Sequence, residues 1–60
     1  MKQSDIYLME LNALSKAMEK NAMDFKQGKL TYEELHAVQY PLSKRIDELR
    51  TLIENENGAG

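Results

Sequence analysis

A turn near the middle of the chain constrains the fold more than any other feature. Gly28 can adopt the left-handed conformation that ends many helices. Thr31 and Glu34 then have the spacing of a capping box, and Leu30 and Leu35 have the spacing of a hydrophobic staple. These two helix-start signals agree that a helix begins directly after the turn.

The segments on both sides of this turn favour helices. They are rich in Ala, Leu, Met, Glu and Lys, which are strong helix formers. Ser4 is the expected N-cap of the first helix, and Asp5 suits the positive end of its dipole. Two helices of similar length joined by a short turn pack antiparallel. We therefore predict one all-α domain, a helical hairpin with a helix over about 5–27, a turn over 28–31, a helix over about 32–55 and a polar tail over 56–60.

Pro41 lies inside the second predicted helix. It interrupts a stripe in which Leu35, Leu42 and Leu49 recur every seven residues. Proline in a straight helix costs about 3 kcal/mol, and a kink lowers that cost. Because the stripe keeps its phase through the proline, we predict one helix that is kinked at Pro41. The alternative is a compact three-helix domain in which a helix ends at Tyr40.

Apolar stripes on both helices predict the seam between them. In the second helix, the stripe is extended by Val38, Leu52, Ile46 and Ile53. In the first helix, the stripe consists of Leu11, Met18 and Phe25, with Tyr7 and Leu14 on the adjoining row. Asn21 falls in that adjoining row. An interior Asn can fix register and oligomeric state, and a place at the edge of the seam is the alternative interpretation.

Three apolar residues of the first helix, Ile6, Met9 and Met23, point away from its stripe. A hairpin covers only one side of each helix, so these side chains would face water. A chain of 60 residues has a small core, and it has no cysteine to form disulfides. We therefore expect self-association, most simply a homodimer that forms a four-helix bundle with coiled-coil packing.

Tyr32, His36 and Tyr40 are spaced four apart and form a ridge along one flank of the second helix. Aromatic rings with polar tips are enriched at protein interfaces, and simple packing along the flank is the alternative. Glu33 and His36 also have the Glu-x-x-His spacing of di-iron bundles. Because Leu35 takes the interior position, this pair turns outward, and we expect no metal and no other cofactor.

The composition does not favour binding to nucleic acid or to membranes. The net charge is −2, from 8 basic and 10 acidic residues. Lysines near the turn are interleaved with acids, as on a solvated helix face. No apolar stretch is long enough to span a membrane, and the start of the chain does not read as a signal peptide, so we expect a cytoplasmic protein.

Two short resemblances point toward regulators that act through protein partners. The segment Leu42–Asp47 resembles the Ser-x-x-Leu-Asp signature of small sporulation phosphatases, although the distance from the turn glycine to Ser43 is about one helical turn too long. The segments YLMEL, LTYEEL and RIDEL are similar to the haemolysin-expression-modulating family, but the tryptophan helix of that family is absent. Neither resemblance assigns the chain to a family.

The sequence therefore predicts a small regulatory or adaptor protein that works by protein–protein interaction. No arrangement of a nucleophile, base and orienting acid is recognisable, and a two-helix element offers little room for a water-excluding cavity. We expect no enzymatic activity. The alternative function is a hairpin dimer that binds RNA or DNA through one helix face.

Overall fold

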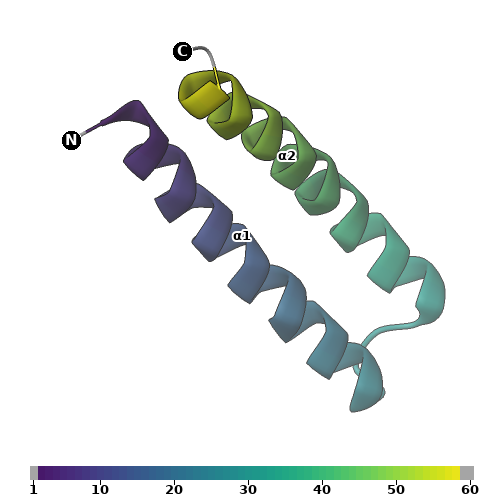
Figure 1. Cartoon of the computed structure of the whole chain (residues 1–60). Helices are drawn as coiled ribbons and strands as arrows, with labels where there is room; N and C mark the ends of the chain where they lie inside the picture. Colours follow the sequence, from purple (N-terminus) through teal and green to yellow (C-terminus); the bar gives the residue numbers. More distant parts are fainter. Residues whose placement is uncertain (1, 59–60) are drawn as a thin grey trace.

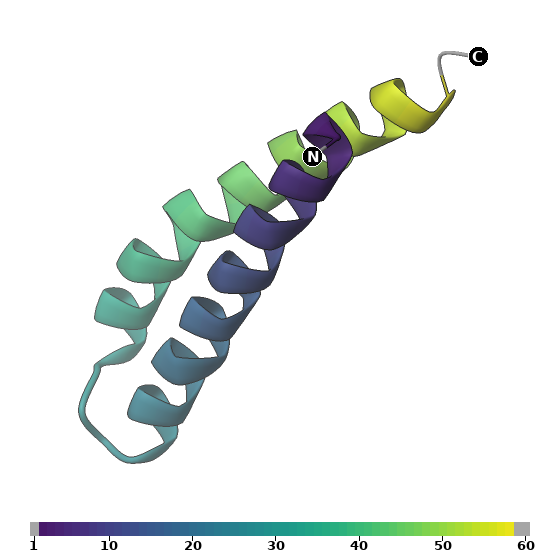
Figure 2. The same ribbon diagram turned by 90° about the vertical axis from the view of Figure 1, so that its left-hand side faces the viewer.

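A computed structural model describes residues 2–58 as two helices joined by a short turn (Figure 1). Helix α1 spans Gln3–Lys26 and helix α2 spans Tyr32–Gly58. The helices run antiparallel, so the two chain ends lie at one end of an elongated molecule of 46 × 18 × 11 Å (Figures 1 and 2). The predicted all-α hairpin is confirmed.

Helix α2 is continuous through Pro41. The second helix therefore does not end at Tyr40, and the three-helix alternative is wrong. A kink at Pro41 stays a prediction. The helix also extends past the expected end at about residue 55 to Gly58, so part of the predicted polar tail is helical, while residues 59–60 lie outside the described part of the chain.

The turn forms as its residues predict. Gly28 has a φ of +79°, and the backbone N–H groups of Gly28 and Lys29 donate to the carbonyls of Phe25 and Asp24 at 3.0 and 2.8 Å. This pair of bonds is a Schellman motif, which satisfies carbonyls at the end of α1. The capping box also forms: the Glu34 N–H donates to the Thr31 hydroxyl at 3.1 Å, and the Thr31 N–H donates to the Glu34 carboxylate at 2.9 Å.

The start of α1 differs from the prediction. Ser4 lies inside the first turn, and the N-cap is Lys2, whose side chain makes no capping hydrogen bond. The Lys2 carbonyl accepts from the Asp5 N–H at 3.0 Å, so the first turn closes before Ser4 could act as a cap. Asp5 keeps its expected place in the first turn.

The core is small. Among the described residues only Leu49, at 0% exposure, and Ile46, at 9%, are buried. The rest of the seam is half-buried, as expected for two helices that cover each other on one side only.

Two predicted seam positions, Val38 and Phe25, are exposed, and Val38 has a competitor within its own helix. Val38 is 39% exposed, and its neighbour Gln39 lies in the seam. There the Gln39 amide donates to the Met18 carbonyl at 3.0 Å and accepts from the Asn21 amide at 3.2 Å. The prediction that Asn21 enters the seam is confirmed, and the polar layer around it includes a second amide.

Candidate interaction surfaces

Four ring-bearing side chains gather near the turn. The rings of Phe25 and Tyr32 meet edge to face, with centroids 6.4 Å apart and planes at 69°. One turn further along α2, the rings of His36 and Tyr40 stack at 6.2 Å and 27°. Tyr32, His36 and Tyr40 therefore follow one another along α2 in two ring pairs, and Phe25 from α1 belongs to the first pair.

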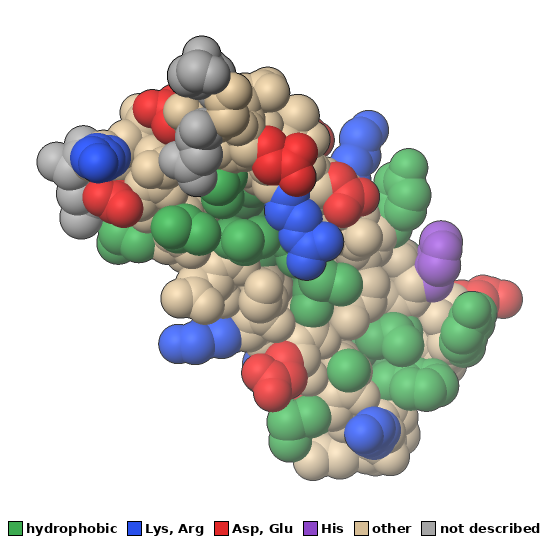
Figure 3. All heavy atoms as spheres, viewed as in Figure 1, with side chains coloured by type: hydrophobic (Ala, Val, Ile, Leu, Met, Phe, Trp, Pro, Cys, Tyr) green, Lys and Arg blue, Asp and Glu red, His purple; other side chains and the backbone are tan. Residues whose placement is uncertain are grey.

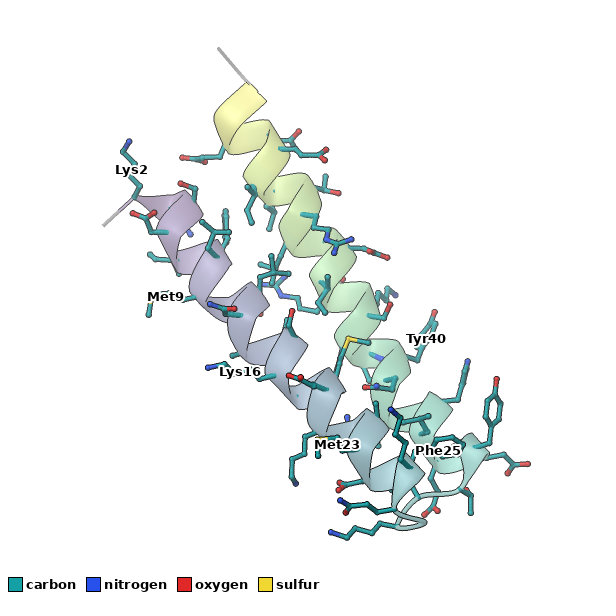
Figure 4. The ribbon with its side chains drawn as sticks, turned by 60° about the horizontal axis from the view of Figure 1, so that its bottom comes forward. Lys2, Met9, Lys16, Met23, Phe25 and Tyr40 are labelled. Carbon is teal, nitrogen blue, oxygen red and sulfur yellow. The ribbon has the colours of Figure 1, made fainter. Side chains whose placement is uncertain are left out.

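This cluster is open to solvent. Tyr32 is 71% exposed and Tyr40 is 61% exposed, and His36 is exposed as well. Phe25, which the sequence placed in the seam, is also exposed. It sits in the last turn of α1, where α2 has only just begun and covers little of the ring (Figure 4). Exposed aromatic rings of this kind are typical of interface anchors.

A second set of apolar residues lies on the outer side of α1. Met9 and Met23 alternate with Lys2 and Lys16 at seven-residue intervals, along the side of α1 that points away from α2 (Figure 4). We call these four residues the outer stripe. Met9 is 60% exposed, and Met23 is also exposed. The two methionines are separated by about 21 Å of helix, with a lysine between them.

An ion pair across the seam distinguishes the two broad faces of the hairpin. The Arg45 guanidinium binds the Glu10 carboxylate through two hydrogen bonds of 2.8 and 3.1 Å, and it also reaches Glu48 at 3.5 Å. Hydrogen bonding to Arg45 lowers the pKa of Glu10 below its ordinary value, and the same bond raises the pKa of Arg45. We call the side of the hairpin that carries this ion pair the Arg45 face. Ile6, half-exposed, lies one turn before Glu10 on this side.

The opposite side carries the ring cluster, and we call it the aromatic face. Residues seven apart on a helix return to nearly the same side. One row of residues on α1 and one row on α2 therefore line this face. Both rows lie beside the seam, on the side of the hairpin opposite the ion pair. These rows consist of Leu8, Ser15 and Ala22 on α1, and of His36, Ser43 and Arg50 on α2.

The aromatic face carries exposed apolar side chains at both of its ends. Figure 3 views the side on which the histidine lies, and green side chains gather there beside the histidine and toward the chain ends. Leu8 is 49% exposed and was not predicted as a site residue. The signal was present in the sequence, because Leu8 belongs to the same run of four apolar residues, 6–9, as Ile6 and Met9.

The six predicted interface residues thus fall into three groups. Tyr32, His36 and Tyr40 belong to the ring cluster, Met9 and Met23 to the outer stripe, and Ile6 to the Arg45 face. Every one of them is exposed. The structure does not unite them in a single site.

Residues 2–58 hold neither a pocket nor a group of three His, Cys, Asp or Glu side chains suited to a metal ion. Glu33 and His36 are both exposed. Neither helix of this part of the chain combines the length and apolar character that a membrane span requires. No protein family model, curated protein or solved structure matches the chain.

Proposed function

We propose that this protein is a small, non-catalytic regulatory or adaptor protein that acts by binding another protein chain. The observation that carries the proposal is the balance between buried and exposed apolar residues. Within residues 2–58, two hydrophobic side chains are buried, whereas eight large ones are exposed. Exposed apolar residues that gather in patches are typical of interaction sites.

The dimensions of the hairpin support the same proposal. It exposes 4733 Å², whereas a compact monomer of 6.9 kDa is expected to expose about 4000 Å². The excess of about 700 Å² is close to the roughly 800 Å² that each partner buries in a standard protein–protein interface. The hairpin therefore has about one interface more surface than a self-sufficient domain of its size.

The charge of the chain favours a protein partner over nucleic acid. Binding to RNA or DNA relies on lysine and arginine side chains that contact phosphates. Here acidic residues outnumber basic ones, and Arg45 is already engaged by two carboxylates. An exposed surface built from rings and aliphatic side chains is better suited to a protein.

Photo-cross-linking in the native cell tests this function. A photoreactive amino acid replaces Tyr32 in one variant and Lys44, an exposed residue on the outer side of α2, in a matched control. We expect discrete protein adducts from position 32 that are absent from position 44. Adducts with RNA or DNA alone, or the same diffuse pattern at both positions, would overturn the proposal.

A further inference from the structure

We propose that the occupant of the aromatic face is a second copy of this chain, so that two hairpins form a four-helix bundle with their ring clusters inside. This inference rests on the proposed function and names its partner. Leu8, Phe25, Tyr32 and His36 would be covered in the bundle. The outer stripe and the Arg45 face would stay on its surface.

The size of the molecule is the first argument for a second copy. The radius of gyration is 14.0 Å, whereas a compact domain of 60 residues is expected at about 10 Å. The hairpin is therefore much more elongated than a compact domain of its length, and its long sides are left uncovered. A second hairpin of equal length covers the whole face.

Charge is the second argument, because two copies that meet through one face must not bring like charges together. On the aromatic face, Lys26 and Arg50 lie among acids that are one helical turn from the rows, Glu19, Asp47 and Glu54. A second copy can therefore place opposite charges against each other there.

The two other exposed surfaces suit a second copy less well. On the Arg45 face the ion-pair cluster has two carboxylates for one guanidinium, so it is net negative. The outer stripe carries Lys2 and Lys16, with Asp5 and Glu19 one helical turn away, and its two methionines are separated by a lysine. Like charges directly opposed across an interface cost several kcal/mol. The aromatic face is the surface that suits self-association.

Side-chain size is the third argument. Ser15 and Ser43 lie near the middle of the face, between Leu8 at one end and the ring cluster at the other. Small residues in the middle let two hairpins approach closely, while larger side chains fill the space at the two ends. Such alternation of large and small residues allows layers to interdigitate.

Sedimentation equilibrium with a matched pair of variants tests the proposal. Leu8 and Met9 are adjacent and similarly exposed, but Leu8 lies on the aromatic face and Met9 on the outer stripe. We expect the parent chain to be a dimer at micromolar concentration. Leu8→Asp should raise its dissociation constant at least about tenfold, which corresponds to 1.4 kcal/mol, and Met9→Asp should leave it unchanged. Dissociation by Met9→Asp and not by Leu8→Asp would overturn the proposed face.

Disulfide trapping gives a second readout that does not depend on the folding of the Leu8 variant. The chain has no cysteine, so one introduced thiol reports one position. Ser43→Cys, alone or mixed with Ser15→Cys chains, should form at least about tenfold more cross-linked dimer than Lys44→Cys, because neighbouring thiols see a millimolar effective concentration. A Ser43–Ser43 cross-link indicates hairpins with their turns at opposite ends, and mixed Ser15→Cys and Ser43→Cys chains that cross-link to each other indicate turns at the same end.

The outcomes separate this proposal from the proposed function. A monomer at several hundred micromolar, with no trapping at residue 43, would exclude the second copy. If position 32 still cross-linked to a different protein in cells, the interaction function would stand and only the identity of the partner would change. A dimer in which Ser43→Cys, alone and mixed with Ser15→Cys chains, traps no better than Lys44→Cys would also overturn the assignment to the aromatic face.

Discussion

Single residues at the turn determine where this chain reverses direction. Gly28 has a positive φ, and a methyl group added at its Cα atom would meet no other atom within 4 Å. The requirement for glycine there is therefore a matter of backbone conformation and not of crowding. The adjacent capping box then starts α2 a few residues later, so the turn is specified on both sides.

Gly28→Ala should destabilise the hairpin by about 1–2 kcal/mol, the cost of a left-handed conformation for a residue with a Cβ atom. Gly58→Ala is the matched control, because its surroundings are equally open and its φ is not positive. That variant should be neutral or slightly stabilising. Urea denaturation of both variants measures the difference, and equal stability of the two would contradict this account of the turn.

The lowered pKa values of two carboxyl groups predict how the free energy of unfolding depends on pH. The backbone N–H and hydroxyl of Thr31 lower the pKa of Glu34, and the hydrogen bond from Arg45 lowers the pKa of Glu10. A carboxyl whose pKa is lower in the folded chain stabilises the fold above its unfolded-state pKa, and this stability is lost as the pH falls through the folded-state pKa. The free energy of unfolding should therefore fall as the pH drops below the ordinary value of 4.5.

The double variant Glu10→Gln and Glu34→Gln should be less stable at neutral pH and should show a shallower fall in acid. Chemical denaturation over a pH series, with Glu33→Gln as an exposed neighbour for control, measures this dependence. If the free energies of unfolding of the parent chain and the double variant changed in parallel with pH, these two carboxylates would not be the cause of the pH dependence.

At the scale of the elements, the seam shows what the sequence predicts and what it does not. Two rows of α2 compete for the interior: one contains Val38, Arg45 and Leu52, and the other contains Gln39, Ile46 and Ile53. A prediction based on the first residue of each row places Val38, and not Gln39, in the interior of the seam. The helix instead turns its isoleucine row inward, because burying the other row would also bring the arginine charge into the seam.

The hairpin itself and the exposure of all six site residues follow from the sequence, since capping signals and helical periodicity are local. The pairing of Phe25 with Tyr32 and the bond between Asn21 and Gln39 do not follow from it. Both depend on the rotation of one helix against the other, and that rotation is set by contacts between residues far apart in the chain. Arg45 was the signal in the sequence that could have predicted this rotation, because the row that contains a charged residue is expected at the edge of the seam.

Pro41→Ala should stabilise the hairpin, because α2 continues through this residue. Alanine restores a hydrogen bond to the Ala37 carbonyl and removes the clash of the ring. The gain is bounded by about 3 kcal/mol and should be well below it, since the unfolded chain also gains freedom worth up to about 1 kcal/mol when proline is lost. Denaturation at matched protein concentration measures the change, and a clear loss of stability would mean that the ring presets a helix start at this position.

At the scale of the whole molecule, the folding of one hairpin and its association are expected to be coupled. A chain of this length rarely gains more than about 3–5 kcal/mol of stability from its own core. Leu49 is the only fully buried side chain among the described residues. Truncating such a leucine to alanine typically costs about 2–5 kcal/mol, which is most of what the isolated hairpin has.

Leu49→Ala should therefore be largely unfolded when it is dilute and regain helix as its concentration rises. A partner that binds only the folded chain adds stability with the logarithm of its concentration, about 1.4 kcal/mol for each tenfold rise well above the dissociation constant. Far-UV circular dichroism from micromolar to near-millimolar concentration follows the helix content of this variant. Leu52→Ala, a half-exposed neighbour in α2, serves as the control and should stay folded throughout. If the helix content of Leu49→Ala did not rise with protein concentration, association would not stabilise the hairpin. The stability of the parent chain would then come from its small core alone.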